Sequence, residues 1–161
     1  AAYIRNYDIK KLTVLFAPYI AKAGYRLADF DDGYIESIIA AVRGNCELLS
    51  DITKMIRIFA DEVPEPKADA VSLISSQEGK SVLKAAKELI ESGHINSDNF
   101  TEITDGIKKK TGLKGKNLFM PVRALLTSAV HGPDLAEMLK LIGFEKIKMR
   151  VNSYYEKSSG V

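Results

Sequence analysis

Apolar residues recur three and four positions apart along most of this 161-residue chain, and this spacing constrains the fold more than any other feature. The pattern is clearest between Ile52 and Phe59, where apolar residues occupy positions i, i+3, i+4 and i+7. That spacing is typical of a helix with one buried face. We find no alternating apolar run bounded by turn residues, as a half-buried strand would require. The sequence therefore predicts an all-α fold.

Glycines and prolines divide this pattern into about eight helices. The expected helices cover residues 7–23, 32–42, 52–59, 75–93, 100–110, 121–129, 133–142 and 147–154. Pro18 should kink or split the first of them. Ser75 and Glu78 have the spacing of a capping box at the start of the fourth. Pro121 and Pro133 are expected in the first turns of their helices, where no N–H is needed.

Two further prolines, Pro64 and Pro66, interrupt the pattern within the acidic stretch 61–67. The residue before a proline is biased against helical backbone, so two prolines one residue apart predict an extended connector. We take this connector as the boundary between two helical subdomains, 1–63 and 64–161. Together they are expected to form a two-part helical cage.

The composition of the chain excludes several classes of protein. A single cysteine, Cys46, excludes a disulfide framework, and no apolar run approaches the roughly 18 residues of a membrane-spanning helix. The N-terminal residues lack the order of a signal peptide, and the chain begins without Met, as a fragment of a longer protein would. We expect a folded cytoplasmic monomer without membrane contact.

Residues suited to catalysis or metal binding are few. His94 and His131 are far apart in the sequence and Cys46 has no local partner, so no metal site is expected. Phosphate-binding loops, dinucleotide-binding motifs and nucleophile elbows do not occur in the sequence. A cysteine–histidine nucleophile pair formed in three dimensions stays open as an alternative. We expect this chain by itself to be neither an enzyme nor dependent on a cofactor.

Charge is distributed unevenly along the chain. Residues 106–133, called here the basic segment, contain no Asp or Glu. The basic segment holds Lys108, Lys109, Lys110, Lys114, Lys116 and Arg123. Lysines are favoured at a helix C-terminus by the helix dipole, and the rest would then be a solvated loop. A surface that faces phosphates would have the same composition, so both interpretations stay open.

The expected helix that begins at Pro121, and the turn after it, place several polar groups near one another. Arg123 and Thr127 are four positions apart on the expected helix and lie off its apolar stripe, so both are expected to face a ligand. His131 and Gly132 form an expected turn. The helix after Pro133 would offer free N–H groups and a positive dipole. Such a helix pair can read base edges or phosphates, and it leaves a helix-turn-helix DNA-binding domain open.

Residues 116–143 also carry a recognisable combination of motifs. A Phe, a Pro and an Arg two residues on are followed by Ala-x-x-Thr, Gly-Pro-x-Leu and a Leu-Ile-Gly stop. This combination resembles the C-terminal anticodon-binding region of bacterial glutamyl-tRNA synthetases. Leu-x-x-Leu at 12–15, Pro-Tyr-Ile at 18–20 and Ala-Gly at 23–24 are similar to the start of the same region. The resemblance covers nearly the whole chain.

The resemblance implies a two-part α-helical cage at the far end of an ATP-dependent ligase that joins glutamate to its tRNA. The His-Ile-Gly-His and Lys-Met-Ser-Lys-Ser types of motif do not occur in this chain. ATP and Mg²⁺ are therefore expected only in a catalytic domain outside it, and tRNA is the expected partner. A helix-turn-helix DNA-binding domain and a helical protein-interaction module are the rival predictions.

Carried over by position, the resemblance implies which residues contact the anticodon. They are Arg43, Asn45, Arg123, Thr127, His131, Gly132, Pro133 and Leu135. The five lysines of the basic segment are the expected contacts to the tRNA backbone. One departure is that Ser128-Ala129 follow Thr127 where the family commonly has Gly then Arg. One expected positive contact is thus missing.

A second departure concerns Asn45, which stands where many members of the family carry a base-reading Arg. An Asn amide offers both a donor and an acceptor, so it can satisfy either C or G at the third anticodon position. On this interpretation the module tolerates both the glutamate and the glutamine anticodon. Alternatively, Asn45 only ends the preceding helix beside Gly44. Both interpretations stay open.

Overall fold

The computed structural model describes residues 7–31 and 33–158 of the chain. This part contains nine α-helices, three 3₁₀ helices and no strands, so the all-α prediction is confirmed. The α-helices are α2 (Ile9–Lys22), α3 (Tyr34–Val42), α4 (Ile52–Ala60), α5 (Ala68–Ser75), α6 (Gln77–Glu91), α7 (Phe100–Thr111), α8 (Lys116–Thr127), α9 (Leu135–Ile142) and α10 (Phe144–Ser158). The 3₁₀ helices are η1 (Leu27–Asp29), η2 (Arg43–Asn45) and η3 (Leu49–Asp51).

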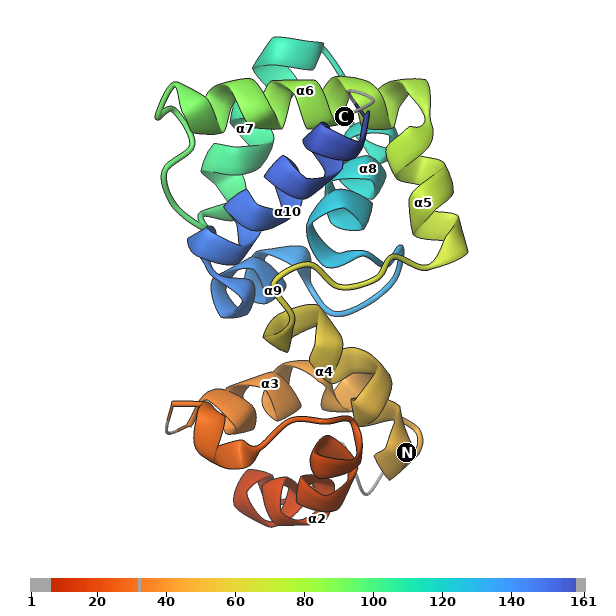
Figure 1. Cartoon of the computed structure of the whole chain (residues 1–161), viewed down its shortest axis with the longest axis vertical. Helices are drawn as coiled ribbons and strands as arrows, with labels where there is room; N and C mark the ends of the chain where they lie inside the picture. The colour runs from red at the N-terminus through yellow and green to blue at the C-terminus, as the bar shows by residue number, and fades with distance from the viewer. Residues whose placement is uncertain (1–6, 32, 159–161) are drawn as a thin grey trace.

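The helices lie in two lobes (Figure 1). Helices α2 to α4 form the first lobe, at the bottom of the view, and α5 to α10 form the second lobe above it. The connector, residues 61–67, is non-helical and runs between them, as its two prolines predicted. None of the helices in the described ranges combines the length and apolar character needed to cross a membrane.

Helix α2 begins where Asp8 accepts hydrogen bonds from the N–H groups of Lys10 and Lys11, at 3.1 and 3.2 Å. Its buried face consists of Leu12, Phe16 and Ile20, one turn apart. The helix runs on through Pro18, so the expected split does not occur. Pro18 lacks the N–H that would bond the Val14 carbonyl, but Val14 is 73% exposed, where water can take that place.

Helix α3 begins at Tyr34, after Gly33 in the left-handed region with φ of 81°. Residue 32, where the sequence placed its start, lies outside the described residues. Helix α4 follows the predicted pattern closely, because Ile52, Ile56 and Phe59 are all fully buried. Spacing alone located this helix.

The second lobe departs from prediction at α5, which was not expected. Helix α5 has eight residues, and only Ala70 and Ile74 of them are buried, too few to show a period. Because α5 ends at Ser75, the N-cap of α6 is Ser76 and not Ser75. The Ser76 hydroxyl accepts a hydrogen bond from the Gly79 N–H at 3.0 Å.

Both first-turn prolines are also placed differently from expectation. Helix α8 begins at Lys116, so Pro121 lies inside it. The residue four positions earlier, Asn117, is exposed, and its carbonyl can be solvated without a helical N–H partner. Helix α9 begins after Asp134, which caps it by accepting from the Glu137 N–H at 3.1 Å. Pro133 therefore precedes the N-cap and is outside the first turn.

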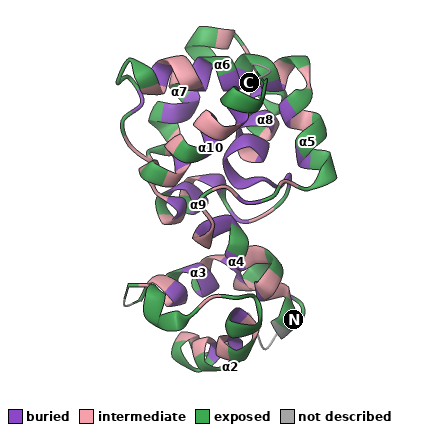
Figure 2. Cartoon of the chain, viewed as in Figure 1, coloured by how far each residue is buried: buried purple, intermediate pink, exposed green. Residues whose placement is uncertain are grey.

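The two lobes share one buried apolar cluster, and buried segments of α3, α4 and α9 meet where the lobes join (Figure 2). Tyr34 of α3 donates its hydroxyl to the Leu141 carbonyl at 2.7 Å. Lys146 of α10 donates to the Phe59 carbonyl at 3.0 Å. The connector coincides with the waist between the lobes, and the division into subdomains 1–63 and 64–161 stays a prediction.

Candidate nucleic-acid interface

The five lysines of the basic segment are all exposed. Three of them form the last turn of α7, and Lys114 and Lys116 flank the link into α8. Lys108, Lys109, Lys114 and Lys116 make no ion pair with any residue that the structure describes. Four lysines without an ion pair in the described part of the chain thus lie at the end of α7 and the start of α8.

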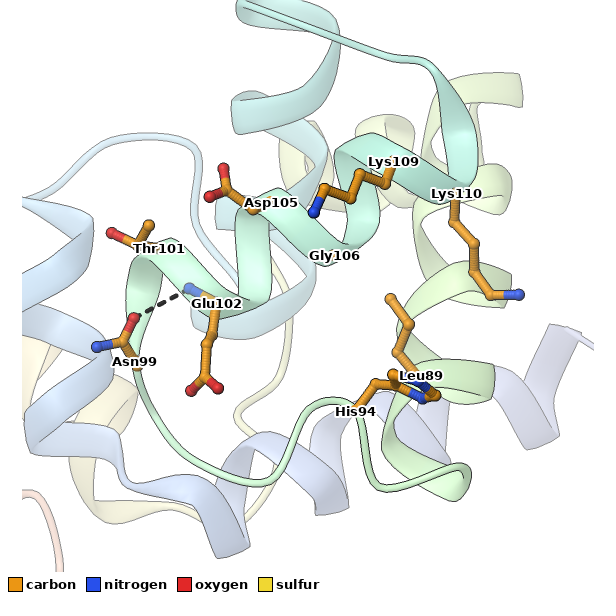
Figure 3. Close-up of a pocket in the computed structure, with 9 residues that line it drawn as sticks. All are labelled: Leu89, His94, Asn99, Thr101, Glu102, Asp105, Gly106, Lys109 and Lys110. Atoms are coloured by element: carbon orange, nitrogen blue, oxygen red, sulfur yellow. Dashed lines mark hydrogen bonds between the residues drawn. The ribbon is translucent and has the colours of Figure 1, made fainter.

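Acidic side chains nevertheless reach this surface from outside the basic segment. Lys110 forms an ion pair with Glu88 of α6 at 2.7 Å, and the charge and hydrogen bond of Lys110 lower the pKa of Glu88. A cavity of about 520 Å³ along α7 is lined by Lys109 and Lys110 together with Glu102 and Asp105 (Figure 3). The absence of acids from residues 106–133 thus does not make the whole surface cationic.

Arg123 lies on α8 about 10 Å along the helix axis from Lys116, at 1.5 Å per residue. Its Nη1 donates to the Pro133 carbonyl at 2.9 Å and lies 3.5 Å from the Met138 sulfur. Gly132 packs against it, since a Cβ added there would lie 3.4 Å from Nη1. The guanidinium thereby holds residues 132 and 133 in place ahead of α9.

Arg123 is half-buried, and burial lowers its pKa, while the nearby charge of Asp134 acts in the opposite direction. Its usual pKa is so high that the guanidinium stays charged. Nη2 and Nε of Arg123 make no hydrogen bond to the described residues. One edge of the fork is therefore free to donate to an acceptor outside the chain.

Thr127 does not face outward, and here the sequence-based expectation is wrong. Thr127 is fully buried. Its hydroxyl donates to the Arg123 carbonyl at 2.8 Å and lies 3.1 Å from the Ala129 carbonyl. The last turn of α8 is covered by neighbouring elements, which a single-helix projection cannot register. Thr127 shapes the turn after α8 and offers no accessible hydroxyl.

The residues between α8 and α9 differ from one another in exposure. His131 is exposed and Gly132 is partly exposed, whereas Pro133 and Leu135 are buried. The last two therefore support the turn, and the surface beside Arg123 comes from residues 131 and 132. The link itself covers residues 128–134, longer than the three or four residues of a helix-turn-helix. This spacing disfavours a helix-turn-helix DNA-binding domain.

Arg43 and Asn45 lie in the first lobe, on η2, apart from the surface formed by Arg123, His131 and Gly132, called here the Arg123 corner. Arg43 is partly buried and donates to the Tyr7 carbonyl at 3.0 Å. Asn45 is exposed, and its side chain forms no hydrogen bond to the described residues. The expected site residues thus form three separate groups, namely the lysines, the Arg123 corner and η2.

Arg150 of α10 was missed by the sequence reasoning. It is fully buried, and it donates four hydrogen bonds to main-chain carbonyls. The acceptors are Ile58 at 2.7 Å, Asp61 at 2.8 Å, Glu62 at 3.1 Å and Leu126 at 2.6 Å. Desolvation lowers the pKa of Arg150 to about 10, so it stays charged at neutral pH. Its position between Ile147 and Tyr154, on the apolar face, was the available signal.

The described residues contain no group of three or more His, Cys, Asp or Glu side chains that could hold a metal ion. Cys46 is buried 3.7 Å from the Met55 sulfur. His94 lies instead beside Ser92, with its Nδ1 2.7 Å from the Ser92 hydroxyl. The alternative of a cysteine–histidine pair therefore has no support in these contacts.

Comparison with known protein families matches residues 11–155 to the family described as anticodon binding domain. Among curated relatives, "Glutamate--tRNA ligase 2" of Syntrophus aciditrophicus is 32% identical over 150 residues, which cover 92% of this chain and 31% of that protein. "Glutamate--tRNA ligase" of Desulforamulus reducens is 31% identical, covering 94% of this chain and 32% of that protein. The chain thus spans about a third of the length of these relatives.

The fold is also found in a solved structure. It is the crystal structure of a glutamate tRNA ligase from Elizabethkingia meningosepticum in complex with its amino acid. The superposition has a TM-score of 0.72 and covers 96% of this chain and 30% of that one, at 19% identity. The helical arrangement described above is therefore the arrangement of one part of that ligase.

Proposed function

The chain belongs to the anticodon-binding domain family, and on that premise we propose that it is the tRNA-reading part of a glutamate–tRNA ligase. The observation that carries the proposal is the family match over residues 11–155, together with relatives named as glutamate–tRNA ligases that are about three times as long. In such a ligase, attachment of glutamate with ATP and Mg²⁺ belongs to another domain.

The Arg123 corner supports a role in base recognition. Bases of a single-stranded loop are splayed out and are recognised on their edges by Arg forks and main-chain groups. Arg123 offers the free edge of its guanidinium beside exposed His131 and partly exposed Gly132. Because Nη1 is held by the Pro133 carbonyl, the remaining donors keep a fixed direction, which favours strict recognition of one base edge.

The lysines of the basic segment support a second kind of contact. Exposed lysines without acidic partners attract phosphates without reading sequence. Lys109 has no ion pair among the described residues, whereas Lys110 is held by Glu88. Lys109 should therefore contribute more to tRNA affinity than Lys110.

We further expect the chain to bind tRNA as a cytoplasmic monomer and to catalyse neither aminoacylation nor ATP–pyrophosphate exchange. Exchange activity with glutamate and ATP, in a preparation free of host synthetase, would contradict the last point. The binding itself can be measured by fluorescence anisotropy with a glutamate tRNA transcript, a transcript with an unrelated anticodon, and duplex DNA of matched length.

Preference for the glutamate tRNA over both competitors would support the proposal. Equal binding of tRNA and duplex DNA would contradict it. Replacing Lys108, Lys109 and Lys110 by Gln should weaken all RNAs about equally and flatten the salt dependence of binding. The same change at Lys10, Lys11 and Lys22, three exposed lysines of α2, is the matched control for the loss of three charges.

A further inference from the structure

A groove of about 200 Å³ lies where the two lobes join. Its walls are α4, the connector, and the turn after α8. Lys54, Arg57 and Lys67 supply its cationic groups, and the buried turn residues 127–129 close one side of it. These side chains come from three separate segments of the sequence.

The groove carries more positive than negative charge. Lys54, Arg57 and Lys67 line it, and Glu65 is the one carboxylate among its lining residues. The Lys54 ion pair with Asp51 is long, at 3.8 Å, and the Lys54 side chain is 75% exposed. Lys67 and Glu65 form no ion pair with the described residues. Three cationic residues thus line the groove against one carboxylate, Glu65, and this excess of positive charge favours an anionic ligand.

Arg57 and Lys67 are both positioned by main-chain hydrogen bonds. Arg57 donates from Nη2 to the Glu65 carbonyl at 2.9 Å and thereby joins α4 to the connector. The Lys67 N–H donates to the Ser128 carbonyl at 3.2 Å, and the Ser128 hydroxyl lies 3.1 Å from the Pro64 carbonyl. Ser128 adopts a left-handed φ of 62° at the end of α8. The connector is thus hydrogen-bonded to the turn after α8, which forms the facing wall of the groove.

Arg150 connects two walls of the groove, α4 and the end of α8, through hydrogen bonds to their main-chain carbonyls. One of its bonds goes to the carbonyl of Ile58, a residue that lines the groove, and another goes to Leu126, next to Thr127. A groove built this way exists before any ligand arrives, and preorganisation lowers the entropic cost of binding. Arg150 is a positioning residue here, because it is buried and cannot touch a ligand itself.

We infer that this groove binds a phosphodiester of the RNA backbone, with Arg57 and Lys67 as the main contacts and Lys54 as a third. The inference rests on the proposed function and deepens it. The volume is below the roughly 300–1,000 Å³ of small-molecule pockets and suits a phosphate with its ribose. Since phosphate contacts carry no sequence information, the groove adds affinity at the junction of the lobes and no selectivity among anticodons.

The test compares the double variant Arg57→Gln/Lys67→Gln with a control, Lys22→Gln/Lys140→Gln, that removes two exposed lysines elsewhere. Binding of the glutamate tRNA transcript is measured between about 50 and 200 mM salt. We expect at least about a fivefold weakening in the groove variant and a salt slope lower by about one to two. Discrimination between anticodons should be unchanged. Arg57→Lys, which keeps the charge, should recover part of the affinity.

Equal affinity and salt slope in the groove variant and the control, with tight binding by the wild-type chain, would overturn this inference and leave the proposed function standing. So would saturable binding of inorganic phosphate to the wild-type groove with unchanged tRNA affinity in the groove variant, because the site would then take the free anion. A wild-type chain that binds no tRNA would overturn both. Urea unfolding of each variant checks that the fold is retained.

Discussion

The guanidinium of Arg123 and the carbonyl of Pro133 are joined by a hydrogen bond of 2.9 Å between α8 and the residues that lead into α9. The bond uses one nitrogen of the fork and leaves the opposite edge without a partner among the described residues. Arg123 therefore combines two tasks, since it supports the turn and presents donors at the surface.

These two tasks can be separated by substitution. Arg123→Ala should weaken binding of the glutamate tRNA by about 1–3 kcal/mol and reduce discrimination between anticodons. It should also lower the free energy of unfolding by about 1 kcal/mol, because the Pro133 carbonyl loses its donor. Anisotropy with cognate and altered anticodons measures the first effect, and urea unfolding measures the second. Unchanged anticodon preference in a folded variant would show that Arg123 only supports the turn.

Asn45 permits a direct test of specificity. Its amide is exposed and has no hydrogen-bond partner in the described part of the chain, so it can rotate to match C or G. We expect less than about a tenfold difference, roughly 1.4 kcal/mol, between tRNAs with glutamate and glutamine anticodons. Asn45→Arg should raise the preference for the glutamate anticodon. An Asn45→Arg variant without any gain would favour the interpretation in which Asn45 merely ends η2.

Arg150→Met should be strongly destabilising. The substitution keeps much of the side-chain volume but removes the donors of four main-chain carbonyls at the junction of the lobes. Buried acceptors without donors cost about 1–3 kcal/mol each, and partial access of water reduces the sum. We expect a loss of about 3–5 kcal/mol in urea unfolding, against less than about 1 kcal/mol for Arg26→Met at an exposed ion pair. A loss similar to that of Arg26→Met would contradict the role given to Arg150.

Stability should fall at alkaline pH, because the buried Cys46 and the partly buried Tyr25 are held in their neutral forms. Burial, with a smaller effect of the Asp51 charge, raises the pKa of Cys46 to about 11. Burial, with the hydrogen bond to Asp61, raises the pKa of Tyr25 to about 12. In the unfolded chain these groups ionise near pH 8.5 and pH 10. The native state therefore binds more protons over this range, and the free energy of unfolding declines as pH rises from about 8.5 to 11.

The decline can be assigned by measuring urea unfolding at several pH values between 8 and 11. Cys46→Ala should decline less steeply than the wild-type chain from pH 8.5 upward. Tyr25→Phe loses the hydrogen bond to Asp61 at every pH, but its pH dependence should become less steep than that of the wild type only at the upper end of the range. Parallel curves for wild type and Cys46→Ala would show that Cys46 does not contribute.

Local patterns in the sequence determined most of the helices, for a physical reason. A helix that buries one face needs apolar residues at a regular period, and Ile52, Ile56 and Phe59 of α4 supply it. This apolar period cannot be recognised in a helix as short as α5. It also gives the wrong start for a helix that contains a proline, as α8 does at Pro121. The sequence also carried the motif at residues 116–143, from which the resemblance to the anticodon-binding family was identified.

The tertiary structure alone decided which of the candidate residues are accessible. Arg123 and Thr127 are one turn apart, yet one has a free edge and the other is fully buried, because burial depends on which elements cover a helix face. The position of Arg150 on the apolar face of α10 indicates burial, but its acceptors, the carbonyls of Leu126 and of Ile58 some 90 positions earlier, follow only from the tertiary structure. A hydrogen bond between segments that are distant in the sequence produces no periodic pattern in it. The Arg150 hydrogen bonds and the groove beside them therefore follow only from how the two lobes pack together.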